Sequence, residues 1–241
     1  MLDPLDAAGW ERATPAAGWA IRDQISHLAY FDEAATLAAV DPERFRAERD
    51  QMVADVDGFT EGIAKRSRAL DVAALHNWFQ NARAAMLQAL LSLDPSTRVP
   101  WYGPDMSIAS SLTARIMETW AHGQDVADAL DATRATTPAL RHVAHIGVRT
   151  LANSFLTRGL DVPDAPVYVA LTSPDGEVWT WGDAAASDRV EGDAVEFCLV
   201  VTQRRHLADT QLAIQGPVAT QWMQIAQAFA GPPGPGRKPS R

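Results

Sequence analysis

Glu118 and His122 lie four residues apart in a stretch of the chain whose pattern predicts a helix. Side chains at this spacing project from the same helix face, one turn apart. A carboxylate and an imidazole placed in this way can bind one metal ion when another helix supplies a third ligand. The isolated His27, in an earlier helical stretch, is the best candidate for that ligand. Together the three would form a His₂Glu site with an open coordination position, as in catalytic zinc sites.

The same spacing is also typical of ordinary surface pairs, which stabilise a helix only weakly. On spacing alone, that simpler interpretation of Glu118 and His122 is favoured. A solvated helix face usually carries long charged residues, however, and this face has small neighbours instead: Ala114, Ala121 and Ala129. The composition therefore favours a face turned into the protein, where a carboxylate needs either a metal ion or an ion-pair partner.

Neighbouring residues could support such a site. Asp125, one turn beyond His122, could orient that imidazole, or it could pair with an N–H group or an arginine. Arg115, one turn before Glu118, could bind an anionic substrate or Glu118 itself, and a structural ion pair is the preferred interpretation.

An aromatic loop and a pair of arginines are weaker candidates. Trp101, Tyr102 and Met106 could line the mouth of a pocket or pack on the core. Arg204 and Arg205, near the end of a helical stretch, could face a cleft between domains. Arginines are also favoured at helix C-termini for electrostatic reasons alone.

The composition of the whole chain limits its class. A formal net charge of −9 argues against a nucleic-acid partner, because binding to phosphates needs a basic surface. The single cysteine, Cys198, excludes an intramolecular disulfide and is expected to be a small buried apolar residue. There is no signal-peptide pattern at the N-terminus and no apolar run of membrane-spanning length. We therefore expect a cytoplasmic protein without a membrane partner; a monomer and a homodimer both remain open.

Helical periodicity dominates the first half, and we expect a four-helix bundle over residues 1–136. The predicted helices run from Arg22 to Val40, from Pro42 to about Leu70, from Asp71 to Leu93, and from Ser107, as N-cap, to about Asp131.

The pattern changes in the second half, where we expect a small α+β domain over residues 137–230. A helix is predicted over Leu140–Leu156, followed by a hairpin of two strands joined by the turn at residues 173–176. A helix over Asp193–Arg204, a short strand over Gln211–Ile214 and a closing helix over Pro217–Phe229 complete an antiparallel α+β unit. The Pro- and Gly-rich residues 231–241 are expected to form a disordered tail.

Two strings carry a family resemblance. The first, GWAIRDQISHL from Gly18 to Leu28, resembles the helix-opening motif of the DinB-like superfamily and, more narrowly, of the mycothiol-dependent maleylpyruvate isomerase family. The second, WYGPDMS from Trp101 to Ser107 followed by RIMETWAHGQDV from Arg115 to Val126, is similar to an actinobacterial branch of that family. The second half resembles the sterol-carrier-like C-terminal domain, so the resemblance spans nearly the whole chain.

The resemblance implies a metal site and a thiol co-substrate. In such proteins the His of the first motif and the Glu and His of the second bind a divalent metal, usually taken as zinc, and these roles fall on His27, Glu118 and His122. Mycothiol is the implied co-substrate. Family members usually carry an extra helix before the first motif, and only a short segment precedes it here, so one flank of the bundle near Trp10 and Trp19 is expected to be exposed.

Three functions are compatible with these features. The first is a metal- and mycothiol-dependent isomerase or thiol S-transferase, in which a metal-bound thiolate attacks a small electrophile. The second is a hydrolase, such as an amidase, that uses metal-activated water. The third is a non-catalytic carrier of an apolar ligand. A complete set of metal ligands favours an enzyme over a carrier, and we predict the first function.

Overall fold

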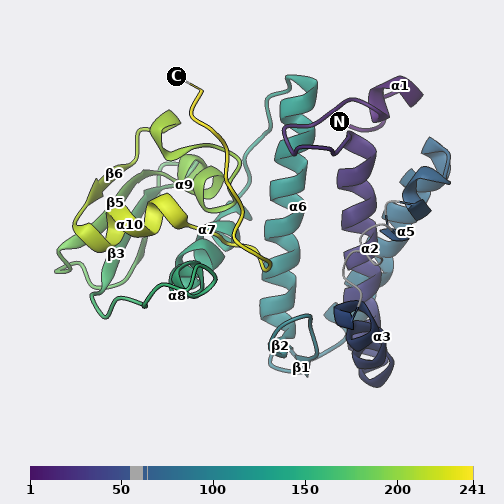
Figure 1. The fold of residues 1–241 in the computed structure, drawn as a ribbon, viewed down its shortest axis with the longest axis horizontal. Coiled ribbons are helices and arrows are strands. Elements are labelled where there is room, and N and C mark those ends of the chain that lie inside the picture. The colour runs from purple at the N-terminus through teal and green to yellow at the C-terminus, as the bar shows by residue number, and fades with distance from the viewer. Residues whose placement is uncertain (55–61, 64, 241) are drawn as a thin grey trace. The chain divides into compact units, whose positions relative to one another are not determined.

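The computed structural model describes residues 1–54, 62–63 and 65–240. The chain divides into two compact units, Met1–Thr133 and Arg134–Arg241, close to the boundary expected from the sequence (Figure 1). None of the helices in the described residues is long and apolar enough to cross a membrane. The two units are described separately.

The first unit is built around one central helix. The elements are α1 (Ala7–Trp10), α2 (Ile21–Val40), α3 (Pro42–Ala54), α5 (Val72–Leu91) and α6 (Ile108–Leu130). Helices α3, α5 and α6 each pack against α2 (Figure 1). A short hairpin of β1 (Arg98–Val99) and β2 (Met106–Ser107) lies between α5 and α6. This arrangement confirms the predicted helical bundle and places α2 and α6 side by side.

Local capping explains where these helices begin and end. The Asp71 carboxylate accepts from the backbone N–H of Ala74 at 2.7 Å, and Ser107 caps α6 in the same way. Asp131 closes α6 in the left-handed conformation, with φ at 51°. The predicted long helix after Pro42 is described as far as Ala54. Residues 65–68 are helical again, and the intervening part of that prediction falls largely outside the described residues.

The N-terminal segment covers one end of the bundle. Trp10 is only 1% exposed and packs with Ile21, Ile25, Leu75 and Val126. The expectation of an exposed flank near Trp10 is therefore wrong, because the short α1 brings this indole onto the helices in place of a longer element.

The second unit is a mixed sheet with helices. Its strands are β3 (Val167–Thr172), β4 (Val178–Trp181), β5 (Asp188–Asp193) and β6 (Ala213–Gln215), in the order β4-β3-β5-β6. The β3–β4 pair is antiparallel, as expected, and so is the β5–β6 pair, whereas β3 and β5 are parallel, so the sheet is mixed and not purely antiparallel. The helices are α7 (Leu140–Arg149), α8 (Leu151–Leu156), α9 (Ala194–Val201) and α10 (Pro217–Ile225), with a 3₁₀ turn at Leu207–Asp209.

Several predictions for this unit need correction. The helix expected over Leu140–Leu156 is divided at Thr150, and strand β5 was not predicted. The closing helix ends at Ile225, because the next backbone groups bind elsewhere: the N–H of Gln227 donates to the Ser154 hydroxyl and the N–H of Ala228 to the carbonyl of Val201.

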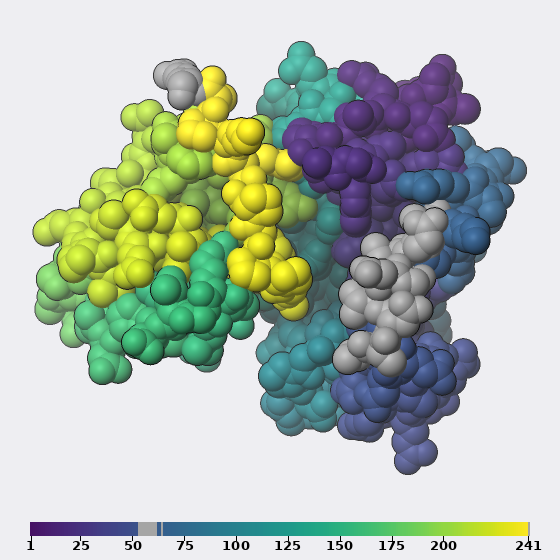
Figure 2. All heavy atoms as spheres, viewed as in Figure 1, coloured from purple at the N-terminus to yellow at the C-terminus, as the bar shows by residue number. Residues whose placement is uncertain are grey.

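The described residues of the C-terminal tail, 231–240, contain no helix or strand. In Figure 2 the tail, in yellow, lies against other residues of the second unit. The Gln227 side-chain amide donates to the carbonyls of Phe229, Gly231 and Pro232. Further along, the backbone N–H of Ser240 donates to the Asp209 carboxylate at 3.0 Å.

Candidate metal centre

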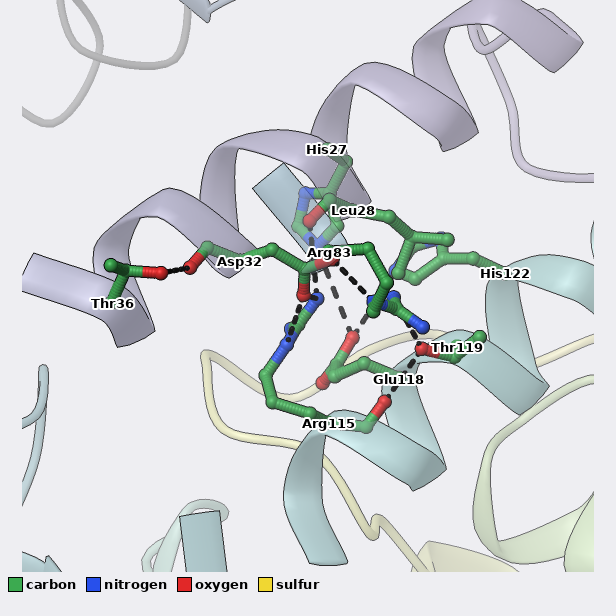
Figure 3. Close-up of polar contacts among 9 residues, drawn as sticks. All are labelled: His27, Leu28, Asp32, Thr36, Arg83, Arg115, Glu118, Thr119 and His122. Carbon is green, nitrogen blue, oxygen red and sulfur yellow. Dashed lines mark hydrogen bonds and ion pairs between the residues drawn. The ribbon is translucent and has the colours of Figure 1, made fainter. Parts of the chain in front are cut away.

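Three side chains converge between α2 and α6. One ligand atom each from His27, Glu118 and His122 lies within 4.8 Å of the other two. The Glu118 Oε2 atom is 3.2 Å from His122 Nε2 and 3.8 Å from His27 Nε2 (Figure 3). The structure thus brings the three predicted residues together: α6 presents the i, i+4 pair and α2 presents the third donor.

Local structure sets the position of His27. The Asp23 carboxylate accepts from the backbone N–H of Ala20 at 2.8 Å, which satisfies a free donor at the start of α2. Helix α2 therefore begins at Ile21, and His27 lies on its second turn.

Glu118 is ionised in this setting. Burial opposes ionisation, but hydrogen bonds and charge interactions with His122 and His27 outweigh it and hold the pKa of the Glu118 carboxyl well below its ordinary value. Its side chain is 21% exposed, so the group is open to a small ligand on one side. A carboxylate flanked by two imidazoles is the electrostatic setting that a cation requires.

Aromatic rings border the two histidines. The Trp19 ring is stacked on His122, with 5.9 Å between centroids and an interplanar angle of 14°, and lies 5.3 Å from His27. Phe31 lies 4.6 Å from His27 on its other side. These rings restrict the orientation of both imidazoles and limit water near them.

Gln24, which the sequence did not single out, lies behind His122. Its side chain is fully buried and its Oε1 atom is in hydrogen-bond contact with His122 Nδ1. Asp125 is also fully buried one turn beyond His122, and its role in orienting that ring stays a prediction. One signal could have found Gln24: it lies three residues before His27, on the same face of α2.

A buried ion-pair network lies next to the site. Asp32, which is fully buried, accepts from Arg83 Nε at 2.6 Å and from Arg115 Nε at 3.0 Å (Figure 3). Arg115 also donates to the carbonyl of Leu28, and Arg83 donates to the Thr119 hydroxyl. A structural ion pair, the preferred interpretation of Arg115, agrees with this geometry, but the partner is Asp32 on α2 and not Glu118, and the guanidinium is only 4% exposed.

The aromatic loop packs on the bundle. Trp101 is stacked on Phe45 at 5.8 Å, and Tyr102 lies 5.5 Å from Phe31. Tyr102 lines a cavity of about 720 Å³ between α2, α3 and α5, and the three candidate metal ligands do not line it. Met106 lies in β2, paired with Val99. Trp101 and Tyr102 both pack on the core, and Tyr102 also lines this cavity; a pocket role for Met106 stays a prediction.

Candidates in the second unit make local contacts. Arg204 Nη1 donates to the carbonyl of Thr202 at 2.6 Å, and Arg205 Nη1 to the carbonyl of Arg204 at 2.7 Å. Their proposed place in a cleft between domains stays a prediction. Cys198 is fully buried, and burial raises the pKa of its thiol well above the ordinary value, in agreement with a structural role.

Comparisons with known proteins show the family and the relatives of this chain. Residues 1–127 match the family model described as the mycothiol maleylpyruvate isomerase N-terminal domain, and residues 163–214 match one described as wyosine base formation. Uncharacterized proteins from two strains of Mycobacterium tuberculosis are 43% identical over 237 residues, covering 98% of this chain and 92% of theirs.

Solved structures show the same fold at low sequence identity. The crystal structures of the mycothiol-dependent maleylpyruvate isomerase and of a mutant of that enzyme both match with a TM-score of 0.53 and 20% identity. Each match covers 84% of this chain and 82% of the other.

Proposed function

The chain belongs to the mycothiol maleylpyruvate isomerase N-terminal domain family, and we propose that it is a divalent-metal-dependent enzyme that uses a mycothiol-type thiol to attack a small electrophile. The observation that carries this proposal is the convergence of His27, Glu118 and His122 from two helices. The reaction is an isomerisation of the maleylpyruvate isomerase kind or a thiol S-transfer.

The donor set fits a catalytic metal. Two imidazole nitrogens and one carboxylate oxygen are the ligands that zinc uses in catalytic sites, where the remaining position stays open. Metal ions in proteins are usually bound by histidine, cysteine, aspartate and glutamate side chains. Among the described residues, the group of such side chains that lie close enough together to hold an ion consists of His27, Glu118 and His122. The ionised Glu118 supplies one negative charge, which favours a divalent cation at this position.

A divalent cation held there would favour the thiolate form of a thiol that binds at the open position. The chain's own residues support that chemistry by holding the donors in place. Trp19 and Phe31 border the two imidazoles and reduce contact with water. The Asp32–Arg115 ion pair fixes α2 against α6, because it joins the helix that carries His27 to the helix that carries Glu118.

The chain needs no nucleophilic side chain for this reaction, because the thiol co-substrate supplies the sulfur. Cys198, the single cysteine, is fully buried in the other unit and cannot reach a substrate. The thiolate would add to an electrophilic double bond or displace a leaving group. Addition would allow rotation about the former double bond before the thiol leaves, which gives an isomerisation.

Metal content tests the site. We expect one divalent metal ion per chain by elemental analysis, and loss of that ion in Glu118→Ala and in His122→Ala. His142→Ala replaces an exposed histidine of the second unit and serves as the matched control, which should keep the metal. Unchanged metal in both site variants would refute the assignment.

Thiol binding tests the reaction class. Calorimetric titration of mycothiol into the metal-loaded protein should give a binding signal that disappears after chelation. Mycothiol binding that persists without metal would refute the proposal that the thiol binds to the metal ion. A metal-loaded protein that binds no thiol would point instead to a hydrolase.

A further inference from the structure

A chain of hydrogen bonds runs from His122 into the N-terminal turn. His122 Nδ1 contacts Gln24 Oε1, and Gln24 Nε2 lies 2.9 Å from the Thr14 hydroxyl. That hydroxyl lies 2.9 Å from the carbonyl oxygen of Trp19. These hydrogen bonds therefore link the candidate metal ligand His122 to the segment that precedes α2.

The chemistry of each group fixes the direction of every bond. The Trp19 carbonyl can only accept, so the single hydroxyl hydrogen of Thr14 must be donated to it. The Thr14 oxygen then accepts from the Gln24 side-chain NH₂ group. This orients the Gln24 amide so that its oxygen faces His122, and a hydrogen must therefore be present on His122 Nδ1.

We propose that Thr14 and Gln24 are positioning residues that hold His122 as the Nδ1–H tautomer and direct its Nε2 lone pair at the metal position. In the neutral ring the second nitrogen carries no hydrogen. Nε2 lies 3.2 Å from the Glu118 Oε2 atom, so a cation shared by the neutral ring and the carboxylate takes the place of the hydrogen that the protonated ring donates to Glu118. The metal part of this inference rests on the proposed function, whereas the tautomer does not.

The structure of the N-terminal turn fixes the positions of Thr14 and Trp19 in this series of hydrogen bonds. The backbone N–H of Thr14 donates to the same Trp19 carbonyl at 2.8 Å, which closes the turn. Gly18 lies within it at φ +79°, a conformation that other residues adopt only with strain. Because the Trp19 ring is stacked on His122, one short turn both supports the hydrogen-bond chain and packs against the ring it orients.

Nitrogen NMR of the metal-free protein at a pH where His122 is neutral tests the tautomer directly. In the wild type, His122 should give the Nδ1–H pattern. In Gln24→Leu, which removes the acceptor but keeps a side chain of similar length, that pattern should be lost. Thr14→Val is a second variant on an only partly buried residue, in case Gln24→Leu does not fold, and Thr14→Ser should retain the wild-type pattern.

Metal affinity, measured by competition with a chelator, is the second readout. Loss of such an outer hydrogen bond typically weakens metal binding by about 10–100-fold, and we expect that loss for zinc in Gln24→Leu. Gln24→Glu keeps an acceptor and should restore binding. Ser26→Ala is the matched control, because this buried hydroxyl on the same helix donates to the Asp23 carbonyl, away from the site.

The outcomes separate this inference from the proposed function. An Nε2–H pattern in the wild type, or zinc affinity equal to wild type in Gln24→Leu and Thr14→Val, would overturn the inference. A wild-type Nδ1–H pattern that depends on Gln24, in a protein that binds no divalent metal, would support this series of hydrogen bonds and refute the proposed function.

Discussion

Removal of the Asp32 carboxylate should be among the most destabilising single changes in the first unit. Asp32 is fully buried and neutralises charge from two guanidinium groups, those of Arg83 and Arg115. Asp32→Ala would delete the contacts at 2.6 Å to Arg83 Nε and at 2.9 Å to Arg115 Nη2. Arg115, which is 4% exposed, would then keep its charge in the interior with only the Leu28 carbonyl as a described hydrogen-bond acceptor.

The expected loss in the free energy of unfolding follows from the buried, unpaired charge of Arg115. Breaking a buried ion pair by removing one partner costs about 3–5 kcal/mol, mainly because the other charge stays buried. Arg83 adds less, since its side chain is 25% exposed and can turn toward water. Native domains are typically stable by about 5–15 kcal/mol, so Asp32→Ala should unfold at a much lower urea concentration than the wild type.

Urea denaturation of metal-free protein is the assay, with a double variant as the critical comparison. Replacing a buried ion pair with apolar side chains is often neutral, so Asp32→Ala/Arg115→Met should recover part of the loss. Glu48→Ala is the matched control, because the Arg44–Glu48 pair is exposed on both sides and should contribute only about 0.3–0.5 kcal/mol. If Asp32→Ala unfolds within about 1 kcal/mol of the wild type, or if the double variant is no more stable than the single one, the reasoning is wrong.

Two further predictions concern titration and reactivity. Burial, together with the Tyr30 hydroxyl, raises the pKa of Tyr102 above its ordinary value. Its contribution to stability is therefore complete below about pH 10 and is lost as pH rises, by up to about 1.4 kcal/mol per pH unit. Urea midpoints from pH 9 to 11 should fall less steeply for Tyr102→Phe, and equal slopes would contradict this. The Cys198 thiol, fully buried and with a raised pKa, should react with a disulfide reagent only in denaturant, and rapid labelling of the native protein would show that its burial is wrong.

The helices of the first unit could be predicted because their signals are local. Apolar periodicity and side-chain caps at Asp71 and Ser107 lie within the segments they define. Strand β5 lacks such a signal, since its sequence DRVEGD is mostly polar and shows no alternation of apolar and polar residues. It is a strand because it pairs with β3 on one side and β6 on the other, and such pairing depends on residues distant in the sequence.

The division of the predicted helix at Thr150 was missed for a different reason. The periodic pattern continues through this residue, so hydrophobicity alone predicts one helix. The Thr150 hydroxyl donates to the carbonyls of Ile146 and Gly147, and a hydroxyl bonded back to the preceding turn in this way often bends a helix. A threonine inside a periodic segment is too common to mark a break by itself.

At the candidate metal centre, the sequence could show which residues share a helix face but not what that face meets. The i, i+4 pair of Glu118 and His122 is equally compatible with solvent and with a neighbouring helix. Whether this pair faces solvent or a neighbouring helix depends on Asp32 and Arg115, whose ion pair joins α2 to α6. Although 83 positions separate these two residues in the sequence, an aspartate on an otherwise apolar face of α2 is itself a signal, because a buried carboxylate needs a partner. Unexplained polar residues on apolar faces, such as Asp32 and Gln24, therefore indicate the neighbours of a site better than its ligands do.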